Sequence, residues 1–126
     1  MIVLDTSVLI YWNLDPVKLT EAAEQAIKEA DQIIVSSISI WEMGLKANRG
    51  RLELPLSIAE YTQRLQKLER LEITPVDVNI WLENLSLNWG HRDPADRTIV
   101  ATASLLNCPL VTSDRTIRAF YKQSIW

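Results

Sequence analysis

Four acidic residues stand where the sequence predicts the start of a helix: Asp5, Glu42, Asp96 and Asp114. Taken singly, each is explained by helix capping, because Asp, Ser and Thr side chains accept hydrogen bonds from the free N–H groups at a helix start. Ser39 and Glu42 have the spacing of a capping box, and Asp96 lies where negative charge favours the helix dipole. Taken together, the four acids should converge, because the carboxyl ends of parallel strands share the edge of a sheet where ligands bind.

A cluster of carboxylates is stable only if some of its members take up protons or a cation neutralises them. Ligands that are all oxygen favour Mg²⁺ or Mn²⁺ over zinc. Such an ion keeps open positions that suit a phosphate oxygen and an attacking hydroxide in phosphodiester hydrolysis. Asp96 shares a helical face with Ile99, Val100 and Ala103, so its carboxylate should point across the sheet edge rather than toward water. The acids therefore predict a metal-dependent hydrolytic site.

The elements that must position these acids can be read from the hydrophobic pattern. We expect strands over residues 2–4, 33–35, 71–76, 109–112 and 124–126, and helices over residues 8–12, 17–30, 38–48, 57–68, 78–89, 95–106 and 115–120. The helix over 17–30 should begin at Asp15-Pro16, and that over 95–106 at the N-cap Asp93 followed by Pro94. Strands that alternate with helices predict an α/β fold with a central, mostly parallel sheet flanked by helices.

Length and composition limit the protein classes further. At 126 residues and 14.4 kDa, with 48% hydrophobic and 23% charged residues, the chain is expected to form a single domain over residues 1–126. A net charge of −3 gives no global signature of a nucleic-acid binder, so any such binding must be local. The lone Cys108 excludes an internal disulfide and suits a reducing cytoplasm. No membrane span or signal peptide is recognisable, and we expect a cytoplasmic protein.

Four segments, in order and spacing, resemble one known family. They are VLDTSVLI, SSISIWEMGLKANRGRLELP, HRDPADRTIVATA and LVTSD. Together they are similar to the PIN-domain ribonucleases and, among these, to the VapC-type toxins of prokaryotic toxin–antitoxin pairs. The resemblance covers nearly the whole chain. It departs from the family at Ala95, where an aromatic residue is frequent, and this concerns packing more than chemistry.

The resemblance implies a PIN-like three-layer sandwich with the activity of a metal-dependent endoribonuclease. It makes Asp5, Glu42, Asp96 and Asp114 the acidic quartet, with Asp5, Asp96 and Asp114 as ligands of Mg²⁺ or Mn²⁺, and Ser7 or Thr6 as the hydroxyl residue that supports the first acid. It implies RNA as substrate, a small VapB-like antitoxin as partner, a homodimer, no membrane, and DNA contact only through the antitoxin.

Other residues near the acids have a functional and a plain structural interpretation. Arg49, Arg51, Arg92, Arg97 and Arg115 could hold RNA phosphates, or could be solvated or paired with the acids. Asp93 competes with Asp96 for the metal, but its place before Pro94 favours capping. We expect His91 to be a surface or capping residue, and Trp41 and Trp81 to lie in the core.

Two other classes of function stay open at this point. One is a non-catalytic PIN-fold module that binds a partner, such as the corepressor half of a toxin–antitoxin complex. The other is a receiver-like phosphoacceptor domain, which also gathers carboxylates at strand ends, although Asp5 lacks the acidic neighbour such a domain needs.

Overall fold

A five-stranded sheet forms the centre of the computed structural model, which describes all residues from 1 to 126. Its order is β3-β2-β1-β4-β5 and every pairing is parallel. The strands are β1 (Ile2–Leu4), β2 (Ile33–Ser36), β3 (Leu71–Thr74), β4 (Leu110–Val111) and β5 (Ser124–Ile125). The predicted α/β fold is confirmed, with a sheet that is wholly rather than mostly parallel.

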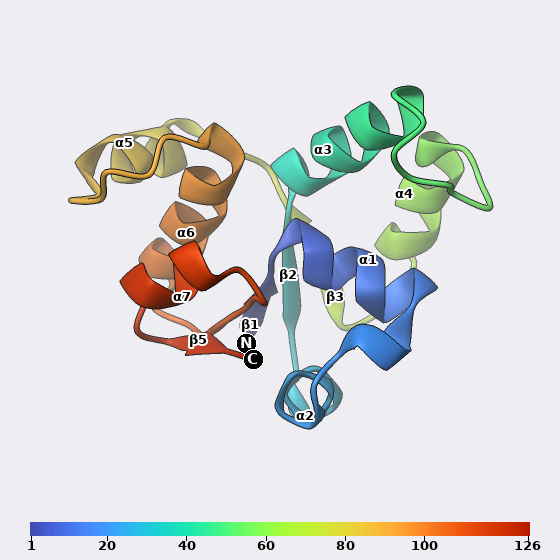
Figure 1. Cartoon of the computed structure of the whole chain (residues 1–126), viewed down its shortest axis with the longest axis horizontal. Helices are drawn as coiled ribbons and strands as arrows, with labels where there is room; N and C mark the ends of the chain where they lie inside the picture. The colour runs from blue at the N-terminus through green and yellow to red at the C-terminus, as the bar shows by residue number, and fades with distance from the viewer.

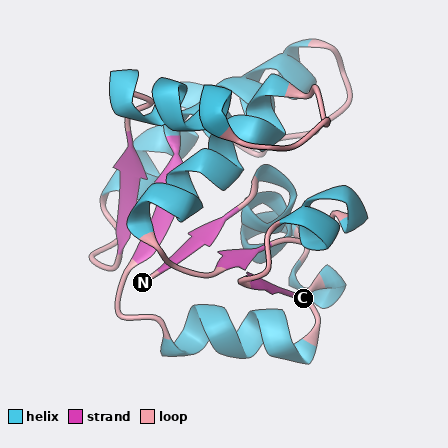
Figure 2. Cartoon of the chain, turned by 90° about the vertical axis from the view of Figure 1, so that its left-hand side faces the viewer, coloured by secondary structure: helices cyan, strands magenta, loops and turns pink.

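Helices cover both faces of this sheet (Figure 1). They are α1 (Thr6–Leu14), α2 (Glu21–Glu29), α3 (Ser37–Asn48), α4 (Ile58–Gln66), α5 (Val78–Ser86), α6 (Pro94–Leu106) and α7 (Arg115–Phe120), with a 3₁₀ turn η1 (Pro16–Lys18). In Figure 1, α5, α6 and α7 lie to the left of β2, and α1 and α4 lie to its right. Figure 2 shows the same layers from the side.

The strands are apolar on both sides because both faces of the sheet are buried. Ile2 and Leu4 of β1 pack into one hydrophobic cluster with α1 to α4, whereas Val3 between them packs into a second cluster with α6 and α7. Successive strand side chains point to opposite faces, so a continuous apolar run supplies both clusters. The three layers expected from the resemblance are therefore present.

Several predicted boundaries were wrong, including those of the helices expected over residues 8–12 and 57–68, which span Thr6–Leu14 and Ile58–Gln66. The helix expected over residues 17–30 begins only at Glu21, where Thr20 caps it, because Asp15-Pro16 starts the separate 3₁₀ turn instead. The strand over 71–76 ends at Thr74 and the helix over 78–89 ends at Ser86. By contrast, α6 follows its predicted cap, since the Asp93 side chain accepts from the Asp96 N–H.

The strand order places a topological switch point between β1 and β4. From β1 the chain moves to β2 and β3 on one side, and then crosses to β4 and β5 on the other. Open α/β sheets bind ligands at the carboxyl ends of strands where the order reverses in this way. The order also excludes the receiver-like alternative, because that class places its third strand beside the first.

None of the helices has the length and hydropathy that a membrane span requires.

Candidate active site

Asp5 occupies the switch point directly after β1. Its backbone N–H donates to the carbonyl of Val111 at 3.1 Å, which continues the pairing of β1 with β4. Asp5 is only 5% exposed, and its Oδ1 accepts from the N–H of Val8 at 2.8 Å, so Asp5 caps α1. The predicted capping role is confirmed, and capping leaves the carboxylate buried at the edge where ligands bind.

Thr112, which we did not predict, links Asp5 to Asp114. Its buried hydroxyl donates to Oδ2 of Asp5 and accepts from the backbone N–H of Asp114 at 3.1 Å. Asp114 in turn caps α7, with Oδ1 accepting from the N–H groups of Thr116 and Ile117 at 2.8 and 3.1 Å. Oδ2 of Asp114 has no partner within the chain, so one oxygen orients this side chain and the other is free.

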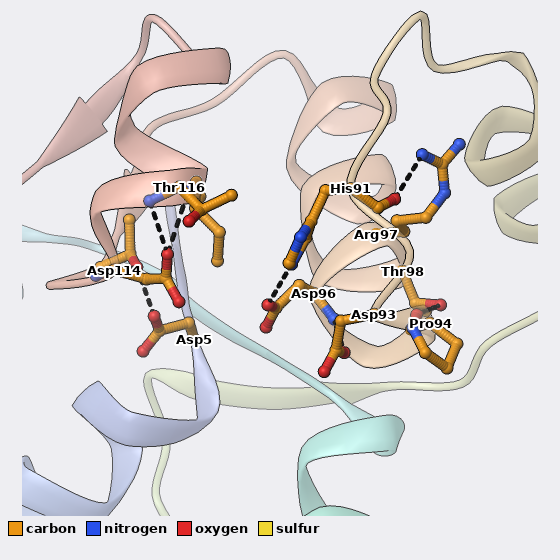
Figure 3. Close-up of polar contacts among 11 residues, drawn as sticks. Asp5, His91, Asp93, Pro94, Asp96, Arg97, Thr98, Asp114 and Thr116 are labelled. Carbon is orange, nitrogen blue, oxygen red and sulfur yellow. Dashed lines mark hydrogen bonds and ion pairs between the residues drawn. The ribbon is translucent and has the colours of Figure 1, made fainter.

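Asp96 lies on the side of α6 that faces Asp5 and Asp114 (Figure 3). The expected direction of its carboxylate is therefore borne out. Oδ2 lies 2.8 Å from Nε2 of His91, which corrects the prediction that His91 is a plain surface or capping residue. The short sequence separation between His91 and Asp96 could have indicated this contact.

Glu42 reaches the site from α3, but not as a member of a capping box. Ser36 is the N-cap of α3, whereas Ser39 lies inside the helix, fully buried. The Thr6 hydroxyl donates to Oε1 of Glu42 at 2.5 Å and lies 2.9 Å from the Ser39 hydroxyl. The prediction that Ser7 or Thr6 supports Asp5 was wrong, because Asp5 is held by Val8 and Thr112. Thr6 holds Glu42 instead, and Ser7 makes no hydrogen bond to an acid.

The acids disfavour one another's charge. Burial raises the pKa of the Asp5 carboxyl from 3.8 to about 6, and the carboxylates of Asp96 and Asp114 add to the rise against the opposing hydrogen bonds. Burial likewise raises the pKa of Asp96 and that of Glu42, each with further repulsion from Asp93. Such mutual repulsion is relieved by a bound cation.

The oxygens of the four acids match the ligand preference of a hard divalent ion. All donors are carboxylate oxygens, which suit Mg²⁺ or Mn²⁺, and Asp96, Asp114 and Glu42 each keep one oxygen free of bonds. As the side chains stand, no group of three or more acids, histidines or cysteines has the arrangement to hold an ion. The chemistry therefore fits, and binding would require the carboxylates to draw together.

The five arginines considered for phosphate binding divide into two groups. Arg49, Arg51, Arg92 and Arg115 are exposed, and the ion pairs of the chain involve other residues. Arg97 instead gives all of its guanidinium N–H groups to the chain: Nε to the Asn84 side chain, Nη1 to the carbonyls of Trp89 and His91, and Nη2 to those of Asn84 and Leu87. Arg97 therefore has no free donor for a phosphate, which corrects its prediction.

Comparison with known proteins adds independent information. The PIN domain family model matches residues 2–123. Among curated proteins, the chain is 35% identical to Ribonuclease VapC22 of Mycobacterium tuberculosis over 119 residues, which are 94% of this chain and 90% of that protein. The identity and coverage are high enough to show common family membership.

Similar solved structures share the fold at low sequence identity. A toxin–antitoxin complex from Klebsiella pneumoniae superposes with a TM-score of 0.70 at 19% identity, covering 100% of this chain and 97% of that chain. Mycobacterium tuberculosis VapC20, described as a sarcin-ricin loop cleaving toxin, gives 0.68 at 14% identity over 94% of both chains. FitAcB from Neisseria gonorrhoeae gives 0.62 at 20% identity over 97% and 94%. By its sequence match and its fold, this chain belongs to the PIN-domain family.

Proposed function

We propose that this PIN-domain protein is an endoribonuclease that hydrolyses RNA phosphodiester bonds at the cluster of Asp5, Asp96 and Asp114, with Glu42 beside it. The observation that carries the proposal is the burial of Asp5 at the switch point, which raises its pKa to about 6 with a smaller contribution from the carboxylates of Asp96 and Asp114. A buried, repelling set of acids lowers stability and is kept where function needs it. The similarity to Ribonuclease VapC22 supports the same activity.

The cofactor that suits this site is Mg²⁺ or Mn²⁺, held by Asp5, Asp96 and Asp114. When bound, such an ion supplies a polarised phosphate oxygen and a water of lowered pKa. The chain's own contribution is orientation: Val8 and Thr112 fix both oxygens of Asp5, and His91 fixes one oxygen of Asp96. Glu42, which Thr6 holds, would orient the attacking water or contact a second ion.

RNA phosphates would be held by the exposed arginines Arg49, Arg51, Arg92 and Arg115. Arg115 directly follows Asp114 and lines a groove of about 530 Å³ with Trp89, Thr116 and Phe120. Arg118, which is also exposed, lines the adjoining groove. Single-stranded RNA binds where cationic groups meet aromatic side chains, so this surface suits the strand beside the cleaved bond.

An endoribonuclease that acts as a toxin requires a partner that inhibits it, and we propose a small VapB-like antitoxin as this partner. One of the similar solved structures supports this, since it is described as a toxin–antitoxin complex. Any contact with DNA would then be made through the antitoxin.

We further propose that the protein forms a homodimer through a surface on α5 and α6, termed here the α5–α6 face. It carries six of the chain's ten exposed large apolar side chains: Val78, Trp81, Leu82, Leu85, Leu105 and Leu106. The prediction that Trp81 lies in the core is thus wrong, as is that for Trp41, which is 59% exposed. Apolar surface gathered in this way marks an interface.

The α5–α6 face has the features that pairing with a second copy needs. It contains both a groove of about 620 Å³, lined in part by Leu82, Leu105 and Leu106, and the protruding Leu85, which is 78% exposed. A two-fold interface joins the same patch on both copies, so a protruding side chain and the groove that receives it must lie on the same patch. Glu83 is the only charged residue in α5, and Asp77 and Glu83 are the only charged residues that line the groove.

A non-catalytic partner-binding module remains the alternative, favoured by one observation. Asp5, Asp93 and Asp114 all cap helices, and no three acids stand in ligating positions. Digestion of total cellular RNA separates the two functions, using protein freed of any copurified antitoxin. The nuclease yields fragments with Mg²⁺ or Mn²⁺ and none with EDTA, whereas intact RNA under every condition would support the binding module.

A further inference from the structure

The side chain of Arg97 points away from the acids and into the segment between α5 and α6 (Figure 3). Its contacts to the carbonyls of Asn84, Leu87, Trp89 and His91 span 2.6 to 3.4 Å. Charge-assisted hydrogen bonds of this number are strong and directional. One guanidinium group thus holds the end of α5 and the irregular segment over residues 87–91 in a single arrangement.

Aromatic packing fixes the same segment from its other side. The Trp89 ring stacks on Phe120 of α7, with centroids 4.6 Å apart and planes inclined by 9°. The His91 ring lies 4.8 Å from the Trp89 ring. Leu87, Trp89 and Phe120 also pack against the second hydrophobic cluster. The His91 ring is therefore positioned by the backbone bonds of Arg97 and by Trp89 together.

His91 in turn contacts the side chain of Asp96. Its Nε2 lies 2.8 Å from Oδ2 of Asp96, and the two side chains are 26% and 24% exposed. The backbone N–H of Asp96 is also held, at 2.9 Å, by the Asp93 cap. With Oδ2 taken, Oδ1 is the oxygen of Asp96 left without a partner, on the side of α6 turned toward Asp5 and Asp114 (Figure 3).

We propose that His91 is a positioning residue for Asp96 and that Arg97 and Trp89 hold His91 in place. The inference rests on the proposed function, since it assigns residues that orient a proposed metal ligand. It also explains why an arginine beside a site acid gives every donor to backbone and amide oxygens rather than to substrate. Partners of this kind, which contact a metal ligand rather than the metal, typically change metal affinity or activity 10- to 100-fold when removed.

The first test compares His91→Ala with His91→Gln, which places an amide N–H at the same number of bonds from Cβ as Nε2. Two responses to Mn²⁺ are measured: the rise in melting temperature of the RNA-free protein and the concentration for half-maximal RNA cleavage. We expect His91→Ala to need about 10-fold more Mn²⁺ and to gain less melting temperature at equal Mn²⁺. His91→Gln should recover most of both responses, and neither variant should melt much lower in EDTA.

The second test concerns Arg97. Arg97→Lys keeps the charge but cannot reach all of the oxygens, so it should weaken the response to Mn²⁺ as His91→Ala does. Because both changes act through one contact, the double variant should lose little more than either single variant. Additive losses would remove Arg97 from the proposal. If Arg97→Lys does not fold, the His91 pair still decides the role of His91.

Failure of the inference and failure of the proposed function give different results. A response to Mn²⁺ in His91→Ala equal to that of the wild type, with Asp96→Asn inert, would overturn the positioning role alone. A wild-type protein that neither cleaves RNA nor gains melting temperature with Mn²⁺ would overturn both.

Discussion

The Thr112 hydroxyl donates to Oδ2 of Asp5 although 107 residues separate the two in the chain. The bond joins the carboxyl ends of β1 and β4, the two strands between which the chain order reverses. The same hydroxyl accepts from the N–H of Asp114. Thr112 therefore sets the relative positions of two site acids, and its loss should disturb both.

Thr112→Val should lower the rate of RNA cleavage by about 10-fold or more, and should lower the free energy of unfolding by about 1–3 kcal/mol because it leaves a buried carboxylate oxygen without its donor. Cleavage assays and urea denaturation measure the two effects. Thr102→Val is the matched control, since the buried Thr102 hydroxyl bonds only the Thr98 carbonyl within α6. Equal cleavage by the two variants would contradict the role given to Thr112.

The pKa of Asp5 predicts how stability depends on pH in EDTA. Since its folded-state pKa of about 6 exceeds the ordinary 3.8, the folded protein binds the proton more tightly than the unfolded chain. The protonated Asp5 carboxyl contributes fully to the free energy of unfolding below about pH 4, and this contribution is lost as the pH rises through 6. Above pH 6 the ionised carboxylate lowers the free energy of unfolding by at most about 3 kcal/mol relative to its value at low pH.

Asp5→Asn removes this titration while keeping an equally good helix cap. At pH 7 in EDTA the variant should unfold with a free energy about 1–3 kcal/mol larger than the wild type, and the difference should vanish near pH 4. Mg²⁺ should stabilise the wild type only. Chemical denaturation across this pH range measures the effect, and a variant less stable than the wild type at pH 7 would refute it.

Arg115→Ala should weaken RNA binding through loss of a phosphate contact. On an Asp96→Asn background, which leaves the RNA uncut, the slope of log affinity against log salt concentration should fall by about 0.7 for a single strand. Fluorescence anisotropy with a labelled RNA measures this slope. Arg64→Ala, exposed on α4 across the sheet, is the control and should leave it unchanged; equal slopes for both variants would exclude the Arg115 contact.

Leu85→Glu should separate the homodimer, because it places a negative charge on the α5–α6 face of both subunits, where the two like charges repel one another. Light scattering coupled to gel filtration should give twice 14.4 kDa for the wild type and 14.4 kDa for the variant. Leu68→Glu, which changes an exposed leucine beyond α4, should remain a dimer. A wild-type mass of 14.4 kDa would end the dimer proposal.

Local signals in the sequence were enough to place most residues of the candidate site. Asp5, Asp96 and Asp114 follow buried strands or begin helices, and these positions depend on nearby apolar spacing and capping residues. The same signals misled where two starts competed: Pro16 and Thr20 both mark a helix start, and only Thr20 begins α2. Ser39 and Glu42 have the spacing of a capping box, but Ser36 is the N-cap of α3 and Ser39 lies within the helix.

The contacts that orient the acids could not be predicted, because they depend on tertiary structure. Nothing near Thr112 in the sequence indicates that it meets Asp5, and nothing near Arg97 indicates that its donors turn toward the end of α5. Residue type and helical location predict that Trp41 and Trp81 lie in the core, yet both are exposed, because neighbouring elements determine which face of a helix is covered. Local patterns thus predict which groups are present, and packing decides what each one touches.

Comparing Asp96→Asn with Asp93→Asn in RNA cleavage with Mg²⁺ or Mn²⁺ shows whether Asp96 belongs to a nuclease site. The two residues lie in the same turn, and the Asp93 side chain caps α6, a role that Asn performs equally well. We expect Asp96→Asn to lose metal-dependent cleavage by at least about 100-fold and Asp93→Asn to cleave like the wild type. Undiminished cleavage by Asp96→Asn would contradict it.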